Sequence, residues 1–222
     1  DHLDYFSSID HIADTFKGYV QNVDSNGYVV GNIDDDRVEE LLMSSKATAV
    51  TIGIKKAADF SAENIIFDSS GFPEFELSVR GNKAGIVKLG VMGIHNIYNA
   101  LAAIASTSII GVSSDEIIKN IEKYCGVHRR LETKGFINNI QIIDDYAHHP
   151  TEIKATLSAL RQSTKEKIFC IFQPHTFTRT KILLDSFSEA FADADKIIIA
   201  DIYAARELDK GEIHSRELTR SE

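Results

Sequence analysis

The spacing of apolar residues changes near Gly126, which divides the chain into two parts with different predicted folds. Upstream, short β-branched and aromatic runs are separated by glycines and by Asp/Asn clusters, a pattern typical of strands and turns. We expect strands at 18–20, 27–30, 47–54, 65–67, 75–79 and 85–89. Residues 96–110 are apolar on most helical faces and predict a buried helix. A second helix is expected at 113–124, because Ser-Ser-Asp-Glu suits a helix start.

Strand and helix patterns alternate downstream of Gly126. We expect strands at 137–144, 167–172 and 194–202, with helices at 150–162 and 178–192. This order predicts a parallel sheet covered by helices, and therefore an α/β fold class. We expect residues 1–125 and 126–222 to form separate domains. In such sheets, ligands bind at the carboxyl ends of the strands.

Composition narrows the classes of partner. The formal net charge of −9 and the pI of about 5.4 argue against a nucleic-acid partner. No apolar run approaches the roughly 20 residues of a membrane-spanning helix, so we expect no membrane segment. Cys125 and Cys170 have no CxxC spacing, which favours two reduced thiols in a cytoplasmic protein.

Polar side chains follow each of the three downstream strands. The segments are 144–150 (Asp-Asp-Tyr-Ala-His-His-Pro), 173–180 (Gln-Pro-His-Thr-Phe-Thr-Arg-Thr) and 201–207 (Asp-Ile-Tyr-Ala-Ala-Arg-Glu). All three are expected at one edge of one sheet. The first segment suits a metal, a phosphate contact or a ribose-binding carboxylate, and these three readings stay open. Arg179 can pair with a carboxylate, whereas Thr178 can simply be a helix N-cap.

Three further groups combine a functional reading with a structural one. His2, flanked by Asp1 and Asp4, can ligate a divalent metal or lie in a surface loop. Asn96 and Asn99 share a helix face, so their amides can bind a base edge or simply pack as buried helix residues. Arg130 and the arginine before it can clamp a phosphate or lie in a solvated hinge.

The sequence holds neither G-x-x-x-x-G-K-[ST] nor G-x-G-x-x-G. A self-contained P-loop ATPase or a dinucleotide-dependent oxidoreductase is therefore not visible in it.

Taken together and in this order, these strings resemble the Mur ligases of peptidoglycan synthesis. The strings are Asp1 to Asp4, Gly93 to Ala100 (Gly-Ile-His-Asn-Ile-Tyr-Asn-Ala), the Arg-Arg-x-Glu segment at 129–132, and the three strand-end segments with 151–153. The last three are similar to the branch that joins L-alanine to UDP-N-acetylmuramic acid. The resemblance implies the end of a central ATPase domain, lacking its P-loop, followed by a truncated Rossmann-like C-terminal domain with a parallel sheet. It implies a hinge near 126–130.

The resemblance also implies a reaction and its participants. ATP would phosphorylate the muramoyl carboxylate, and alanine would attack the resulting acyl phosphate, with Mg²⁺ as a cofactor. UDP-N-acetylmuramic acid and L-alanine would be the substrates. The isolated chain would be an incomplete, inactive part of that enzyme.

Residue roles follow from the same resemblance. His2 would ligate a second Mg²⁺, Asn96 and Asn99 would lie near adenine, and Asp145 would bind the ATP ribose. The reacting centre would be formed by Arg130 on phosphate, Tyr146 and His148 facing the reacting atoms, and His175 and Arg179 on the amino acid or the new carboxylate.

Three rival functions remain open. One is a ligand-binding relative without turnover, and another is a plain α/β interaction domain. The third is a sibling ligase with another acceptor, such as the murein tripeptide ligase, which amino-acid dependence of turnover would separate.

Overall fold

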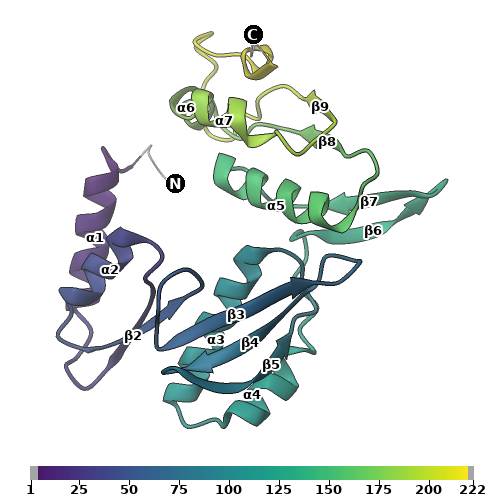
Figure 1. Ribbon diagram of the computed structural model, residues 1–222. Coiled ribbons are helices and arrows are strands. Elements are labelled where there is room, and N and C mark those ends of the chain that lie inside the picture. The colour runs from purple at the N-terminus through teal and green to yellow at the C-terminus, as the bar shows by residue number, and fades with distance from the viewer. Residues whose placement is uncertain (1–4, 220–222) are drawn as a thin grey trace. The chain divides into compact units, whose positions relative to one another are not determined.

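The computed structural model describes residues 5–219, which form two compact units. The upstream unit is Ser8–Cys125, and the downstream unit holds the residues from Gly126 on, together with residues 5–7. Figure 1 shows that helices and strands occur in both units. None of the described helices is long and apolar enough to span a membrane.

A mixed sheet forms the centre of the upstream unit, in the order β1-β2-β3-β4-β5. Its strands are β1 (Tyr28–Asn32), β2 (Thr48–Gly53), β3 (Phe60–Phe67), β4 (Pro73–Val79) and β5 (Asn82–Lys88). The first three run parallel, and β3, β4 and β5 pair antiparallel. Along β4, Phe75 and Leu77 are buried while Glu74 and Glu76 alternate with them, as expected for a sheet with one face on the core.

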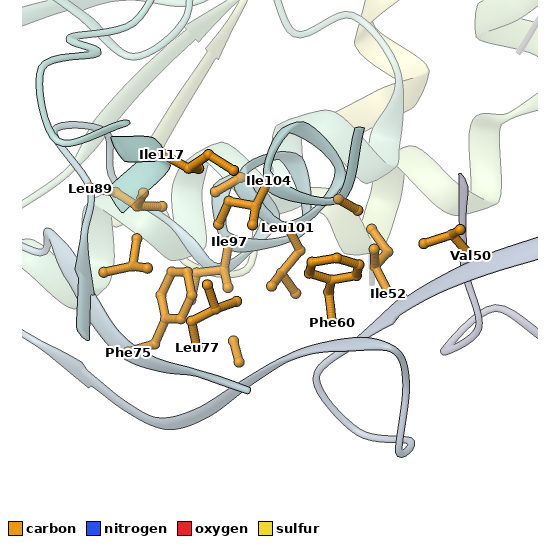
Figure 2. Close-up of a cluster of buried hydrophobic side chains, with 14 residues drawn as sticks. Val50, Ile52, Phe60, Phe75, Leu77, Leu89, Ile97, Leu101, Ile104 and Ile117 are labelled. Carbon is orange, nitrogen blue, oxygen red and sulfur yellow. The ribbon is translucent and has the colours of Figure 1, made fainter. Parts of the chain in front are cut away.

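The buried face of this sheet packs against α3. The helices of the unit are α1 (Ile9–Gln21), α2 (Asp36–Met43), α3 (Ile94–Ile109) and α4 (Ser114–Ile121). Figure 2 shows the resulting core, in which Ile97, Leu101 and Ile104 of α3 lie against Phe60, Phe75 and Leu77 of the strands. The expected buried helix at 96–110 is therefore confirmed, because its apolar faces fill this core.

The expected strand at 18–20 is wrong, because these residues belong to α1. The Oγ of Ser8 accepts a hydrogen bond from the N–H of His11 at 3.0 Å, so an N-cap begins a helix upstream of the glycine. Val20 is buried on one face of this helix. Tertiary packing thus overrides the β-propensity of Gly-Tyr-Val.

The downstream unit contains two small sheets. Its elements are β6 (Glu132–Ile137), β7 (Ile140–Asp144), α5 (Pro150–Ser163), β8 (Phe169–Phe172), α6 (Phe177–Ile182), α7 (Leu184–Ala190), β9 (Lys196–Ile199) and the 3₁₀ helix η1 (Ser215–Thr219). β8 and β9 pair in parallel, as predicted. The prediction that 137–144 joins the same sheet is wrong, because β7 pairs antiparallel with β6.

Two local features account for the differences in this unit. Asn138 and Asn139 both adopt positive φ, which turns the chain between β6 and β7 into a hairpin. The single helix expected at 178–192 is divided at Leu183, so that Thr180 and Phe187 are both fully buried. The core of the unit comprises Ile153, Leu157, Phe172, Phe187, Ala190, Phe191 and Leu218.

Replacement of Leu101 by alanine tests the upstream core. Leu101 is 0% exposed, so Leu101→Ala should lower the free energy of unfolding by about 2–5 kcal/mol through lost burial and a cavity. Urea unfolding followed by circular dichroism measures the change. Ile110→Ala is the control, since Ile110 is 78% exposed and its loss should change the free energy by no more than about 0.5 kcal/mol. Equal effects of the two substitutions would contradict the described core.

Candidate functional site

The two polar segments after β8 and β9 lie side by side in the downstream unit. The N–H of Thr176 donates to the carbonyl of Tyr203 at 2.9 Å, and the N–H of Tyr203 donates to the carbonyl of Pro174, also at 2.9 Å. His175 and Tyr203 are therefore held as neighbours in an isolated parallel bridge. The expectation that these two strand ends meet at one edge is confirmed.

The segment after β7 reaches the same place, although β7 belongs to another sheet. The ring centroids of Tyr146 and His148 lie 5.5 Å apart, those of His148 and His175 lie 6.4 Å apart, and those of His175 and Tyr203 lie 5.5 Å apart. We call these four residues the ring row. It joins all three segments singled out by the sequence.

Arginines lie beside the ring row at two points, Tyr146 and His175. The guanidinium carbon of Arg129 lies 4.7 Å from the Tyr146 ring centroid, and that of Arg130 lies 5.9 Å from it. Both distances suit cation–π attraction. At His175, Nη1 of Arg179 lies 3.2 Å from Nδ1 of the imidazole. Cationic side chains that can bind an anionic substrate group thus lie beside the row, where Arg129 also pairs with Asp144 at 3.6 Å and Arg130 with Glu152 at 3.3 Å.

Glu152 holds the loop that carries His148. Its Oε2 accepts hydrogen bonds from the N–H groups of His148 at 3.1 Å and His149 at 3.2 Å, completing a capping box at the start of α5. Its Oε1 lies 3.3 Å from Nη1 of Arg130. Burial acts to raise the pKa of Glu152, but these hydrogen bonds and the charge of His148 hold it below its ordinary value. One ionised carboxylate thus anchors both a histidine loop and an arginine.

Asp145 organises the chain on the other side of Tyr146. Its two oxygens accept hydrogen bonds from the N–H groups of Leu131 and Ala147, both at 2.8 Å. Leu131 and Arg129 adopt positive φ, a backbone conformation that residues other than glycine rarely take. Each carboxylate oxygen keeps a second lone pair, so a ribose hydroxyl can still bind. The ribose role of Asp145 stays a prediction.

Two histidines at the site, His175 and His149, have a pKa below the ordinary value. Burial lowers the pKa of His175, and the charges of Arg179 and His148 lower it further, against an opposing effect of Glu207. A guanidinium only donates, so Nδ1 of His175 accepts from Arg179 and the neutral ring carries its proton at Nε2. Burial likewise lowers the pKa of His149, which caps α5. Nδ1 of His148 faces the carbonyl of Tyr146 at 3.1 Å, so this nitrogen donates.

The amide pair of the upstream unit lies at the start of α3. Nδ2 of Asn96 donates to the carbonyl of Met92 at 2.8 Å, and Nδ2 of Asn99 donates to Oδ1 of Asn96 at 3.0 Å. The carbonyl oxygen and the second N–H of the exposed Asn99 can then face a ligand. An adenine edge offers the matching donor and acceptor, so the residues present fit this base. The pair as an adenine site stays a prediction.

His2 lies outside the described residues, so its role as a metal ligand also stays a prediction. Within residues 5–219, no group of three or more His, Cys, Asp or Glu side chains is arranged to hold a metal ion.

Sequence reasoning assigned no role to several residues of this site. Tyr203 completes the ring row, and Oε2 of Glu207 accepts a hydrogen bond from the N–H of Thr178 at 2.9 Å. Thr176, and not Thr178, is the N-cap of α6. Only Glu152 had a local signal, since an acidic residue three positions after a capping residue is typical of a capping box.

Two family models match this chain and between them cover most of it. The Mur ligase middle domain matches residues 1–107, and the glutamate ligase domain of Mur ligases matches residues 129–220. Among curated proteins, the UDP-N-acetylmuramate–L-alanine ligase of Acetivibrio thermocellus is 51% identical over 98% of this chain. The enzyme of that name from Clostridium beijerinckii is 48% identical over 98% of it. The chain spans about half the length of these relatives, 47% and 48% respectively.

Solved structures agree with these matches. The UDP-N-acetylmuramate–alanine ligase of Thermotoga maritima superposes with a TM-score of 0.73 at 30% identity, over 91% of this chain and 44% of that one. A murein peptide ligase from Psychrobacter arcticus superposes with a TM-score of 0.65, also at 30% identity, over 87% of this chain and 41% of that one. The α/β fold class is thereby confirmed.

Titration of His175 tests the electrostatics of the ring row. Its lowered pKa means that protonation is resisted in the folded state, so the neutral arrangement is stable at neutral pH and is lost as the pH falls below about 6.5 through the folded-state pKa. Arg179→Ala should raise this pKa, because one cause of the shift is removed. The imidazole proton signal in NMR, recorded against pH, measures it.

Lys181→Ala is the matched control, since Lys181 lies on the same helix but pairs with Glu212. It should leave the titration of His175 unchanged. The described contact would be refuted by an unaltered midpoint in the Arg179 variant, or by equal changes in both variants.

Proposed function

Since this chain belongs to the Mur ligase family, we propose that it is part of an ATP-dependent ligase that joins L-alanine to UDP-N-acetylmuramic acid. The identity of 44–51% to ligases of that name supports this choice of substrates. The structural observation that carries the proposal is the ring row with its arginines. It brings the three polar segments together beside arginine side chains.

The proposed chemistry explains why such a site is needed. A carboxylate does not acylate an amine at neutral pH, because oxide is a very poor leaving group. The lactyl carboxylate would first attack the γ-phosphorus of ATP, forming an acyl phosphate and releasing ADP. The alanine amine would then attack the carbonyl carbon, phosphate would leave, and the amine would lose a proton. Both steps bring anions together, so positive side chains lower the barrier.

The roles of the downstream residues follow from their positions. Arg130, held by Glu152, would contact the transferred phosphate. Arg179 would hold the carboxylate of alanine, which a guanidinium binds with two parallel hydrogen bonds. Tyr146, His148 and His175 would surround the reacting carbonyl and amine.

The nucleotide would be recognised by three residues. Asn96 and Asn99 would bind the adenine edge and Asp145 the ribose. Mg²⁺ is part of the proposal through His2, and no step is derived from it. A cytoplasmic location is proposed as well, since ATP and the nucleotide-linked sugar are cytoplasmic substrates.

A sibling ligase is the second candidate, favoured by the similarity to the murein peptide ligase of Psychrobacter arcticus. Its acceptor would be a peptide in place of alanine. Turnover that depends on a murein tripeptide and not on L-alanine would select this alternative.

ADP release is the test of the proposed function. A full-length protein containing this chain should release ADP only when ATP, UDP-N-acetylmuramic acid and L-alanine are all present. The 222-residue chain alone should release none above background, because the sequence holds no G-x-x-x-x-G-K-[ST] loop for the phosphates. ADP release that does not require L-alanine, or ADP release by this chain alone, would contradict the proposal.

Arg130→Ala tests the phosphate role within the full-length protein. Loss of a cation from the transition state should lower kcat/KM by about 100-fold or more. The free energy of unfolding should change by no more than about 1 kcal/mol, because the Arg130–Glu152 ion pair is largely exposed. Lys134→Ala is the control, since it removes a similarly exposed ion pair with Glu132 in the same unit. Wild-type kcat/KM in the Arg130 variant would remove Arg130 from the mechanism.

A further inference from the structure

Asp34 lies just after β1 and accepts hydrogen bonds from four groups. Its oxygens accept from the N–H groups of Ile54 at 2.8 Å, Lys55 at 3.0 Å and Lys56 at 2.8 Å. The hydroxyl of Tyr98, on α3, donates to Oδ2 at 2.7 Å. One carboxylate thus joins the end of β1, the loop after β2 and the first turns of α3.

The loop after β2 is shaped to receive a carboxylate. Three successive N–H groups that converge on one point form a concave anion site, and here the anion is supplied by the protein itself. Gly53 precedes the loop, and a Cβ there would lie 3.0 Å from the carbonyl oxygen of Lys56 and 3.3 Å from Oδ1 of Asp34. A larger residue at position 53 would crowd these two atoms, which would have to move by a few tenths of an ångström to make room.

The start of α3 has no capping side chain. The N-cap residue is Gly93, with a φ of 92° and no side-chain hydrogen bond to the helix. The other helices of the upstream unit are capped by Ser8, Asp35 and Ser113. The hydrogen bond from Tyr98 to Asp34 links the first turns of α3 to the segment that follows β1.

Tyr98 stands between the two amides that are proposed to bind adenine. It is two residues after Asn96 and one before Asn99, so the rotation of this helical turn sets the direction of both amides. We propose that Asp34 and Tyr98 are positioning residues that orient the Asn96–Asn99 pair toward the nucleotide base. This inference rests on the proposed function, because it takes that pair as the adenine site.

The charge state of the pair supports this role. Burial acts to raise the pKa of Asp34, but the hydrogen bonds from Ile54, Lys55, Tyr98 and Lys56 outweigh it and lower the pKa to about 2. Burial and the neighbouring carboxylate raise the pKa of Tyr98. A charged acceptor and a protonated donor therefore face each other at neutral pH, and such a hydrogen bond is stronger than a neutral one.

The test is nucleotide binding by this chain, with Tyr98→Phe as the variant. Phenylalanine keeps the ring and removes only the hydroxyl. Titration of the ¹⁵N-labelled chain with AMP, followed through the side-chain amide signals of Asn96 and Asn99, measures the dissociation constant. We expect it to rise about fivefold, the effect of losing one orienting hydrogen bond.

A double-mutant cycle separates positioning from general stability. If Tyr98 acts through the amides, Tyr98→Phe should weaken AMP binding in the wild-type background and weaken it less in an Asn99→Ala background, where only Asn96 is left to be oriented. Ser113→Ala is the matched control, because it removes the N-cap of α4 in the same unit, whose Oγ accepts from the N–H of Glu116. It should lower the melting temperature but leave AMP binding unchanged.

Each outcome decides the matter. No change in Tyr98→Phe, an equal loss in the Asn99→Ala background, or an equal loss in Ser113→Ala would overturn the positioning role. Absence of any saturable AMP shift at Asn96 and Asn99 in the wild-type chain would instead refute the adenine site of the proposed function, and the inference with it.

Discussion

Half-buried carboxylates that accept hydrogen bonds from main-chain N–H groups hold the functional loops of both units. A loop that follows a strand makes no hydrogen bonds to a neighbouring strand, yet its main-chain N–H groups still require acceptors. Asp34 meets this requirement upstream, and Asp145 and Glu152 meet it downstream. Each of these three acids also places a group of the candidate site, because the loop that it fixes carries or contacts a site residue.

The hydrophobic cores hold in place the helices and strands from which these loops extend. In the upstream unit, α3 presses its apolar residues onto the sheet, so the start of this helix can move only by disturbing the core shown in Figure 2. In the downstream unit, Phe172 at the end of β8 packs on Phe187 and Phe191, directly before the segment that carries His175. Close packing thus limits the freedom of the segments that follow each strand.

Charge in the two candidate sites is arranged in opposite ways. The ring row lies beside arginines, and the pKa of its His175 is lowered, so the row offers cationic donors to anionic groups. The negative charge of Asp34 is instead stabilised by hydrogen bonds from main-chain N–H groups of its own unit, which form a concave site around the carboxylate. The first arrangement is suited to chemistry and the second to holding a helix in place. A ligase that brings several anions together needs both.

The amino-acid sequence by itself determined the α/β class, the change of pattern near Gly126, and the strand ends worth attention. Such features depend on local periodicity and on short polar strings, which a sequence displays directly. It also marked His175, Tyr146 and Arg179, whose segments do meet. Only the tertiary structure decided that 18–20 is helical, that β7 forms a hairpin, and that Tyr203 and Glu207 adjoin the site. Asp34 and Tyr98 are 64 residues apart in the sequence, so no local sequence pattern predicts their hydrogen bond. Such contacts arise from the packing of distant elements, which becomes defined only once the chain has folded.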